Sequence, residues 1–86
     1  MEFSFSNRFI KDFKKLNSDE KRTLASMLSL LSDNQHHPSL RTKKVQRTDD
    51  IFECSINMSI RMTWQYREET IFLRTVGYHD NVLKNP

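Results

Sequence analysis

Glycine, proline and cysteine are scarce in this sequence, and each scarcity excludes a class of structure. Gly77 is the one glycine in 86 residues, which excludes a glycine-rich loop that cradles a phosphate. Two prolines, Pro38 and Pro86, form no Pro-rich linker, and we expect a single domain over residues 1–86. One cysteine, Cys54, permits no internal disulfide. We interpret it as a buried apolar side chain, with a nucleophile as the alternative.

Long apolar runs are absent as well. No stretch approaches the ~20 apolar residues that span a bilayer as a helix. Residues 1–8 lack the basic-then-apolar layout of a secretory signal. We therefore expect a cytoplasmic protein with no membrane partner. The three histidines and the cysteine show no ligand spacing, so we expect neither a metal nor a cofactor.

Positive charge exceeds negative charge modestly, with a formal net charge of +3, and part of the excess is concentrated. Arg41, Lys43, Lys44 and Arg47 place four cations within seven residues. Such a cluster suits a polyanion or an acidic protein partner. A solvated basic loop is the alternative, and charge alone does not decide between the two.

The first part of the chain has one short strand pattern followed by two helical patterns. Residues 1–6 alternate in polarity, which predicts a strand. Residues 7–16 carry apolar side chains at helical spacing with basic residues between them, which predicts an amphipathic helix. A second helix is expected to begin after Asn17, which forms a capping-box pattern with Glu20, and to end near Asp33. The two helices together predict a helical hairpin.

After Pro38 the apolar period changes from about 3.6 to 2 residues. Strands are expected over residues 44–46, 51–57, 60–66 and 70–76. Gly77 is expected to end the last strand. Strands in a run after helices predict an α+β fold, with a three- to four-stranded antiparallel meander. We expect the helices to cover one face of this sheet, and the first strand to join it at an edge or beside the last strand.

Alternation along residues 60–66 places Arg61, Thr63 and Gln65 on the face away from the helices, together with Glu53 and Ser55 of the preceding strand. An arginine at mid-strand on an open sheet face is well placed to bind phosphate, because it presents a planar fork of donors. The alternative is an exposed arginine paired with Glu53 across the strands, a contact of small energetic value.

A second candidate for chemistry follows the last strand. His79 is expected on a loop there, and histidine is the side chain best suited to move protons near neutral pH. The adjacent Asp80 could fix its tautomer. The alternative is an ordinary loop histidine.

The order of strand, two helices and meander, together with three short segments, resembles the RelE/ParE superfamily of toxins, particularly its RelE, YafQ and HigB branches. The segments are HPSLR at 37–41, IRMTW at 60–64 and RTVGYHD at 74–80, with Val82 and Leu83 close behind. The resemblance covers nearly the whole chain and implies the RelE-like microbial RNase fold.

The resemblance also implies a function. Members are toxins of type II toxin–antitoxin pairs, and the RelE-like and YafQ-like branches cut mRNA in the ribosomal decoding site without a metal. Arg61 falls where RelE-like toxins contact the scissile phosphate, and His79 falls where the YafQ branch has a catalytic histidine. For the mechanism, we expect Arg74 or a loop lysine to support Arg61 in stabilising the charge on the phosphate. The expected RNA contacts are Arg41, Lys43, Lys44, Arg47 and Leu83.

Some positions depart from the family pattern. Leu83 stands where the family often has a tyrosine or phenylalanine that stacks on a base. Glu53 and Ser55 stand where lysines or a histidine are common, and Arg47 replaces a usual turn glycine. Two other functions therefore stay open, a ParE-like inhibitor of DNA gyrase and a decayed toxin that only binds its antitoxin. A cognate antitoxin is an expected partner in every case, with mRNA and the ribosome added for an active nuclease.

Overall fold

A five-stranded sheet in the order β1-β5-β4-β3-β2 organises the computed structural model, which describes residues 1–86. In chain order the elements are β1 (Glu2–Phe5), α1 (Asn7–Lys14), α2 (Ser18–Asp33), the 3-10 helix η1 (Pro38–Leu40), β2 (Lys43–Lys44), β3 (Phe52–Ser55), β4 (Ile60–Arg67), β5 (Thr70–Tyr78) and α3 (His79–Lys84). Strand β1 pairs in parallel with β5, and every other pair is antiparallel. The predicted α+β fold is confirmed, with β1 both at an edge and beside the last strand.

Local capping explains where the two long helices begin. The Ser6 hydroxyl caps α1 by accepting a hydrogen bond from the Phe9 amide at 2.9 Å. At the start of α2 the Asn17 side chain accepts from the Glu20 amide, and the Glu20 carboxylate accepts from the Asn17 amide, both at 2.8 Å. The predicted capping box is therefore confirmed. Helix α1 ends at Lys14, two residues before the predicted limit, and Leu16 still packs in the core.

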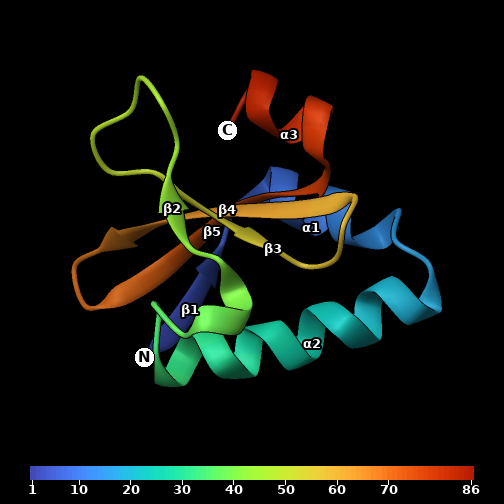
Figure 1. The fold of residues 1–86 in the computed structure, drawn as a ribbon, viewed down its shortest axis with the longest axis horizontal. Helices are drawn as coiled ribbons and strands as arrows, with labels where there is room; N and C mark the ends of the chain where they lie inside the picture. Colours follow the sequence, from blue (N-terminus) through green and yellow to red (C-terminus); the bar gives the residue numbers. More distant parts are fainter.

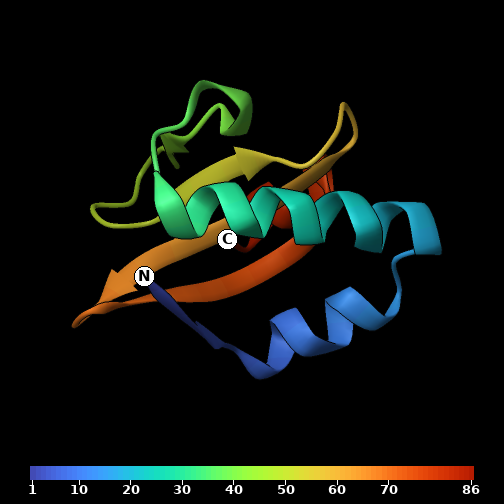
Figure 2. The ribbon, with the colours of Figure 1, turned by 90° about the horizontal axis from the view of Figure 1, so that it is seen from below.

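The core lies between the helices and one face of the sheet, and Figure 2 shows α2 crossing that face with α1 below it. Trp64 is fully buried there and stacks on Phe52 with ring centroids 4.8 Å apart. Its indole N–H donates to the Cys54 sulfur at 3.0 Å. Burial raises the pKa of the Cys54 thiol, even though the hydrogen bonds from Trp64 and Thr42 lower it. The interpretation of Cys54 as a buried side chain is confirmed.

The end of the chain differs from the prediction. Strand β5 continues through Gly77 to Tyr78, and α3 follows at once, on the side of the sheet opposite α2 (Figure 1). Val82 is the buried anchor of α3, and its Cγ2 lies 3.5 Å from where a Cβ on Gly77 would stand. The prediction that Gly77 ends the strand is therefore wrong, and a Cβ at this position would make only an ordinary van der Waals contact with Val82. None of the helices combines the length and the apolarity required to span a bilayer.

Helix α3 therefore covers part of the sheet face that points away from α2. Thr63 and Gln65 are directed to that face, as predicted, but both are buried there. The Thr63 hydroxyl lies 2.6 Å from the Thr75 hydroxyl and donates to the carbonyl oxygen of Pro86 at 2.9 Å. The expectation of an exposed face was wrong at these positions, because the sequence offered no sign that the residues after β5 fold back over the sheet.

A bulge in β5 sets the direction of one predicted site residue. Thr63 pairs with Thr75, whereas the next residue, Trp64, pairs with Leu73. Arg74 is therefore left between the two pairs, as the extra residue of a β-bulge. Its side chain emerges on the α3 side, where it contacts Gln65.

Candidate functional site

Three surface hollows contain most of the predicted site residues. The first hollow, of about 300 Å³, lies at the β3–β4 turn. The second, of about 460 Å³, lies between β2 and α3. The third, of about 440 Å³, lies between α1, β5 and the end of α3. Each hollow contains at least two cationic side chains, but the groups that bind these cations within the chain differ from one hollow to the next.

The first hollow brings Arg61 and Arg41 together. Both side chains line it, with Ser39 and Ser55 among their neighbours. Arg61 is half-buried, and its Nη1 donates to the carbonyl oxygens of Asn57 at 2.6 Å and Ile60 at 3.2 Å. The guanidinium is thus held by the main chain of its own turn, and its other donors have no partner within the chain. Such a held fork is suited to a phosphate oxygen.

The turn itself is built by Asn57. Its side-chain oxygen accepts hydrogen bonds from the amides of Ser59 and Ile60, both at 2.8 Å. This arrangement is the tight connection expected from an asparagine at that position. The alternative interpretation, a cross-strand pair between Arg61 and Glu53, is wrong, because Arg61 lies opposite Ser55 in the register. Glu53 is buried and forms its ion pair with Lys43 instead, at 3.9 Å.

His79 begins α3 and does not lie on a loop. Its amide donates to the Ser59 carbonyl oxygen at 3.0 Å, and Arg61 lies opposite Gly77 in the β4–β5 register. The main chain of His79 is therefore held close to the turn that carries Arg61. Its side chain is 49% exposed, and Nδ1 lies 3.2 Å from a carboxylate oxygen of Asp80. Nε2 has no partner within the chain, so it is available for proton transfer to a bound substrate.

The second hollow gathers four predicted RNA contacts, which are Lys43, Lys44, Arg47 and Leu83. Lys43 and Lys44 come from β2, and Leu83 is presented from α3. Arg47 has a φ of 67°, a left-handed conformation that glycine adopts more readily. The positive φ suits the glycine that the resemblance leads one to expect at this turn, and Arg47 adopts it despite its Cβ. Glu53 also lines the hollow and offsets one of its cations.

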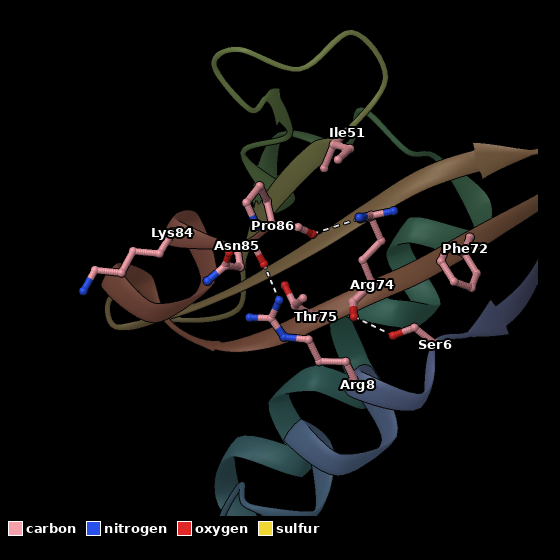
Figure 3. A pocket seen from close by; sticks show the side chains of 9 residues that line it. All are labelled: Ser6, Arg8, Ile51, Phe72, Arg74, Thr75, Lys84, Asn85 and Pro86. Carbon is pink, nitrogen blue, oxygen red and sulfur yellow. Dashed lines mark hydrogen bonds between the residues drawn. The ribbon is translucent and has the colours of Figure 1, made fainter.

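The third hollow contains Arg74 and is shown in Figure 3. The Arg74 Nε donates to the Pro86 carbonyl oxygen at 2.9 Å, and its Nη1 donates to the Gln65 side chain. The structure does not bring Arg74 together with Arg61, because the register partner of Arg61 lies three residues beyond Arg74 on β5. The sequence grouped the two arginines, whereas the structure places them in separate hollows.

Sequence reasoning missed Arg8 and Lys84, which line the third hollow with Arg74. Arg8 Nη1 donates to the carbonyl oxygen of Asn85, a residue 77 positions away. No local pattern signals a contact of that separation. Nowhere in the structure do three histidine, cysteine or carboxylate side chains converge as ligands for a metal.

Comparison with known proteins gives the fold. No family model matches the chain, and no curated protein matches it in sequence. Among solved structures, YoeB from Staphylococcus aureus is 17% identical with a TM-score of 0.78, covering 92% of this chain and 97% of its own. YafQ from E. coli is 14% identical with a TM-score of 0.79, covering 94% of this chain and 96% of its own.

The toxin–antitoxin complex RelBE from E. coli gives a similar result. Its matching chain is 21% identical with a TM-score of 0.73, and the match covers 90% of this chain and 94% of that one. Identities this low establish the fold alone. Over nearly its whole length the chain has the fold seen in YoeB, YafQ and the RelBE complex.

Proposed function

We propose that this chain is the toxin of a type II toxin–antitoxin pair and that it cleaves mRNA. The main-chain bond between His79 and Ser59 carries the proposal, because it holds the backbone of a residue with a half-exposed imidazole beside the turn of Arg61. These are the two positions at which the family resemblance implies catalytic residues. The shared fold with RelE, YafQ and YoeB supports the same function.

The proposed reaction uses the RNA's own nucleophile. The 2′-hydroxyl oxygen attacks the adjacent phosphorus, the bond from phosphorus to the 5′-oxygen breaks, and a 2′,3′-cyclic phosphate and a 5′-hydroxyl result. One group must take the 2′ proton, and one must give a proton to the leaving 5′-oxygen. His79 Nε2 performs one of these transfers, while Asp80 orients the ring through Nδ1. The second proton is transferred by a group of the ribosome or by solvent water, and the geometry of the bound RNA positions the reacting atoms.

Arg61 is assigned to the charge that develops on the phosphate. The donors of its guanidinium that the turn does not use can bind non-bridging oxygens as the negative charge increases. Arg41 lines the same hollow and adds a second positive charge. Lys43, Lys44 and Arg47 are assigned to the RNA strand or ribosomal RNA beyond the scissile bond, and Leu83 to a neighbouring base.

The partners follow from the same proposal. RelE and YafQ have been solved in complex with an antitoxin, as RelBE and DinJ–YafQ. We therefore propose a cognate antitoxin for this chain, besides mRNA and the ribosome. An antitoxin that neutralises it is expected to cover part of the basic surface formed by the first two hollows.

The test is expression of the chain in growing bacteria, with primer extension on a translated mRNA. The wild type should arrest growth and produce new 5′ ends within the reading frame. Arg61→Ala should reduce cleavage by about 10²- to 10³-fold, because it removes one charge contact in the transition state. Arg22→Ala, which removes an exposed arginine on α2, is the matched control. Intact mRNA together with inhibited DNA supercoiling by gyrase would replace the nuclease proposal with the ParE-like alternative.

A further inference from the structure

Tyr78 carries the most exposed aromatic ring of the chain, at 60%. The other exposed rings, Phe5, Phe13 and Tyr66, each contact another aromatic ring or a lysine ammonium. No aromatic or cationic side chain lies over the ring of Tyr78, and its hydroxyl has no hydrogen-bond partner within the chain. One exposed ring is ordinary on a protein surface, so its surroundings decide what it can bind.

Tyr78 lines a fourth hollow, of about 240 Å³, between α1 and the junction of β5 with α3. Beside the tyrosine ring, the lining includes four buried apolar side chains, which are Leu16, Ile60, Val76 and Val82. Asn81 is exposed and adds a side-chain amide that has no hydrogen-bond partner within the chain. Apolar and aromatic walls with a few polar groups are typical of sites for small organic groups, and here they suit a flat, partly polar one.

The charges around the fourth hollow favour an uncharged group over a phosphate. Arg8 and Lys15 line it, but Asp12 and Glu20 line it as well, so the formal charges of the lining cancel. Asp12 lies 3.9 Å from Arg8 Nε and offsets that cation directly. A phosphate therefore gains little net attraction here. A nucleobase is uncharged and flat, and its edges carry the donors and acceptors that an amide can bind.

The fourth hollow adjoins the first hollow across the turn between β3 and β4. Met58 lines the first hollow and Ile60 lines the fourth, and their Cα atoms are at most about 7.6 Å apart because one residue separates them. That residue, Ser59, accepts the main-chain hydrogen bond from His79, which directly follows Tyr78. An RNA strand with one phosphate in the first hollow can therefore place a neighbouring base in the fourth.

We infer that the fourth hollow is a base-binding subsite, in which the ring of Tyr78 stacks on the base of a nucleotide next to the scissile phosphate and the Asn81 amide bonds to the edge of that base. The inference rests on the proposed function, since the strand held here is the one cut beside His79. Stacking of unpaired bases on aromatic side chains is a common means of binding single-stranded RNA. Tyr78 takes no part in proton transfer and positions the strand.

The test measures binding of a short single-stranded 2′-O-methyl RNA, which cannot be cleaved because its 2′-oxygen has no proton to lose. Tyr78→Leu keeps an apolar side chain without a ring and should weaken binding at least about fivefold, as expected for the loss of one stacked base. Tyr78→Phe is the matched control, because it keeps the ring, and it should bind nearly as tightly as the wild type. Equal affinities of the leucine and phenylalanine variants would overturn the subsite.

The location of binding is read independently from the NMR signals of the tyrosine rings in the wild-type chain. The chain has two tyrosines, and Tyr66 lies six residues along β4 from Ile60, the register partner of Tyr78, or about 20 Å away. The ring protons of Tyr78 should shift upfield on addition of the RNA, because a stacked base lies over them, while those of Tyr66 stay in place. Unmoved Tyr78 signals would overturn the subsite, whether or not the variants fold.

The outcomes separate the subsite from the nuclease and from a protein partner. Cleavage of translated mRNA by a wild-type chain whose Tyr78 signals do not move with RNA would reject the subsite and retain the nuclease. Shifted Tyr78 signals in a chain that leaves mRNA intact would support the subsite and reject the nuclease. Wild-type RNA affinity of Tyr78→Leu, with growth no longer rescued by the cognate antitoxin, would overturn the subsite and assign the ring to the antitoxin.

Discussion

The amide nitrogen of His79 donates a hydrogen bond to the carbonyl oxygen of Ser59 over 3.0 Å. The bond joins the first residue of α3 to the turn between β3 and β4, and the same turn holds the Arg61 guanidinium through Asn57. The proposed catalytic pair is therefore positioned by main-chain contacts. The imidazole does not take part in them, so its chemistry can be altered without disturbing the frame.

The first prediction concerns that imidazole. His79→Gln retains the amide bond to Ser59 and a polar side chain of similar size, but it cannot transfer a proton near neutral pH. We expect mRNA cleavage to fall by at least about 10²-fold. The thermal unfolding midpoint should stay close to that of the wild type, because the side chain is half-exposed. Primer extension and thermal denaturation measure the two quantities, and wild-type cleavage by this variant would remove His79 from the mechanism.

The second prediction concerns the left-handed residue in the basic loop. Arg47 has a φ of 67°, which is unfavourable for any residue with a Cβ. The Arg47→Gly variant should therefore be more stable than the Arg47→Ala variant, with a free energy of unfolding higher by about 1 kcal/mol. Both variants lose the same charge, so both should bind RNA more weakly and to the same extent. Urea denaturation and a salt titration of RNA binding measure these effects. A glycine variant less stable than the alanine variant contradicts the conformational explanation.

The third prediction concerns the missing aromatic residue. Leu83 lies on α3 and lines the hollow with Lys43 and Lys44, but it has no ring to stack on a base. Stacking of one base on an aromatic side chain contributes about 1–3 kcal/mol. Leu83→Phe should therefore bind 2′-O-methyl RNA at least about fivefold more tightly. Leu83→Met, which enlarges the apolar contact without a ring, should stay near wild type. Equal gains in both variants would show that stacking is not the cause.

The fourth prediction concerns pH and the buried thiol. Burial raises the pKa of Cys54 above its ordinary value of 9.0, so the folded chain holds this proton more tightly than the unfolded chain. The resulting stabilisation is fully present below pH 9.0 and is lost as the pH rises above that value through the folded-state pKa. Between pH 8 and pH 10, roughly, the wild type should lose more free energy of unfolding than Cys54→Ala. Identical slopes for the two chains would contradict the buried, protonated thiol.

Several features of the fold were predictable because they depend on neighbouring residues. The capping box of Asn17 and Glu20 is written within four positions, and the structure contains it. The alternation along β4 correctly separated the core residues Met62 and Trp64 from Thr63. Local patterns of this kind determine which side of an element a residue occupies, and they are read reliably from sequence.

The candidate site was predictable only in part. Arg61 and His79 were identified through the family resemblance, and the geometry holds them to one turn. The prediction that Arg74 supports Arg61 at one site was wrong, because the bulge and the length of β5 direct Arg74 into another hollow. Helix α3 was missed because its six residues are too few to show a helical period.

The sequence by itself determined the α+β order of elements, the helix starts and the inward-facing residues, since each of these follows from a period or a cap within a few positions. Tertiary structure alone decided which cations meet. Arg8 reaches Asn85 across 77 positions only because β1 pairs with β5 and α3 folds back over the sheet. Contacts between distant segments depend on sheet order and chain reversal, and no local pattern in the sequence encodes either of them.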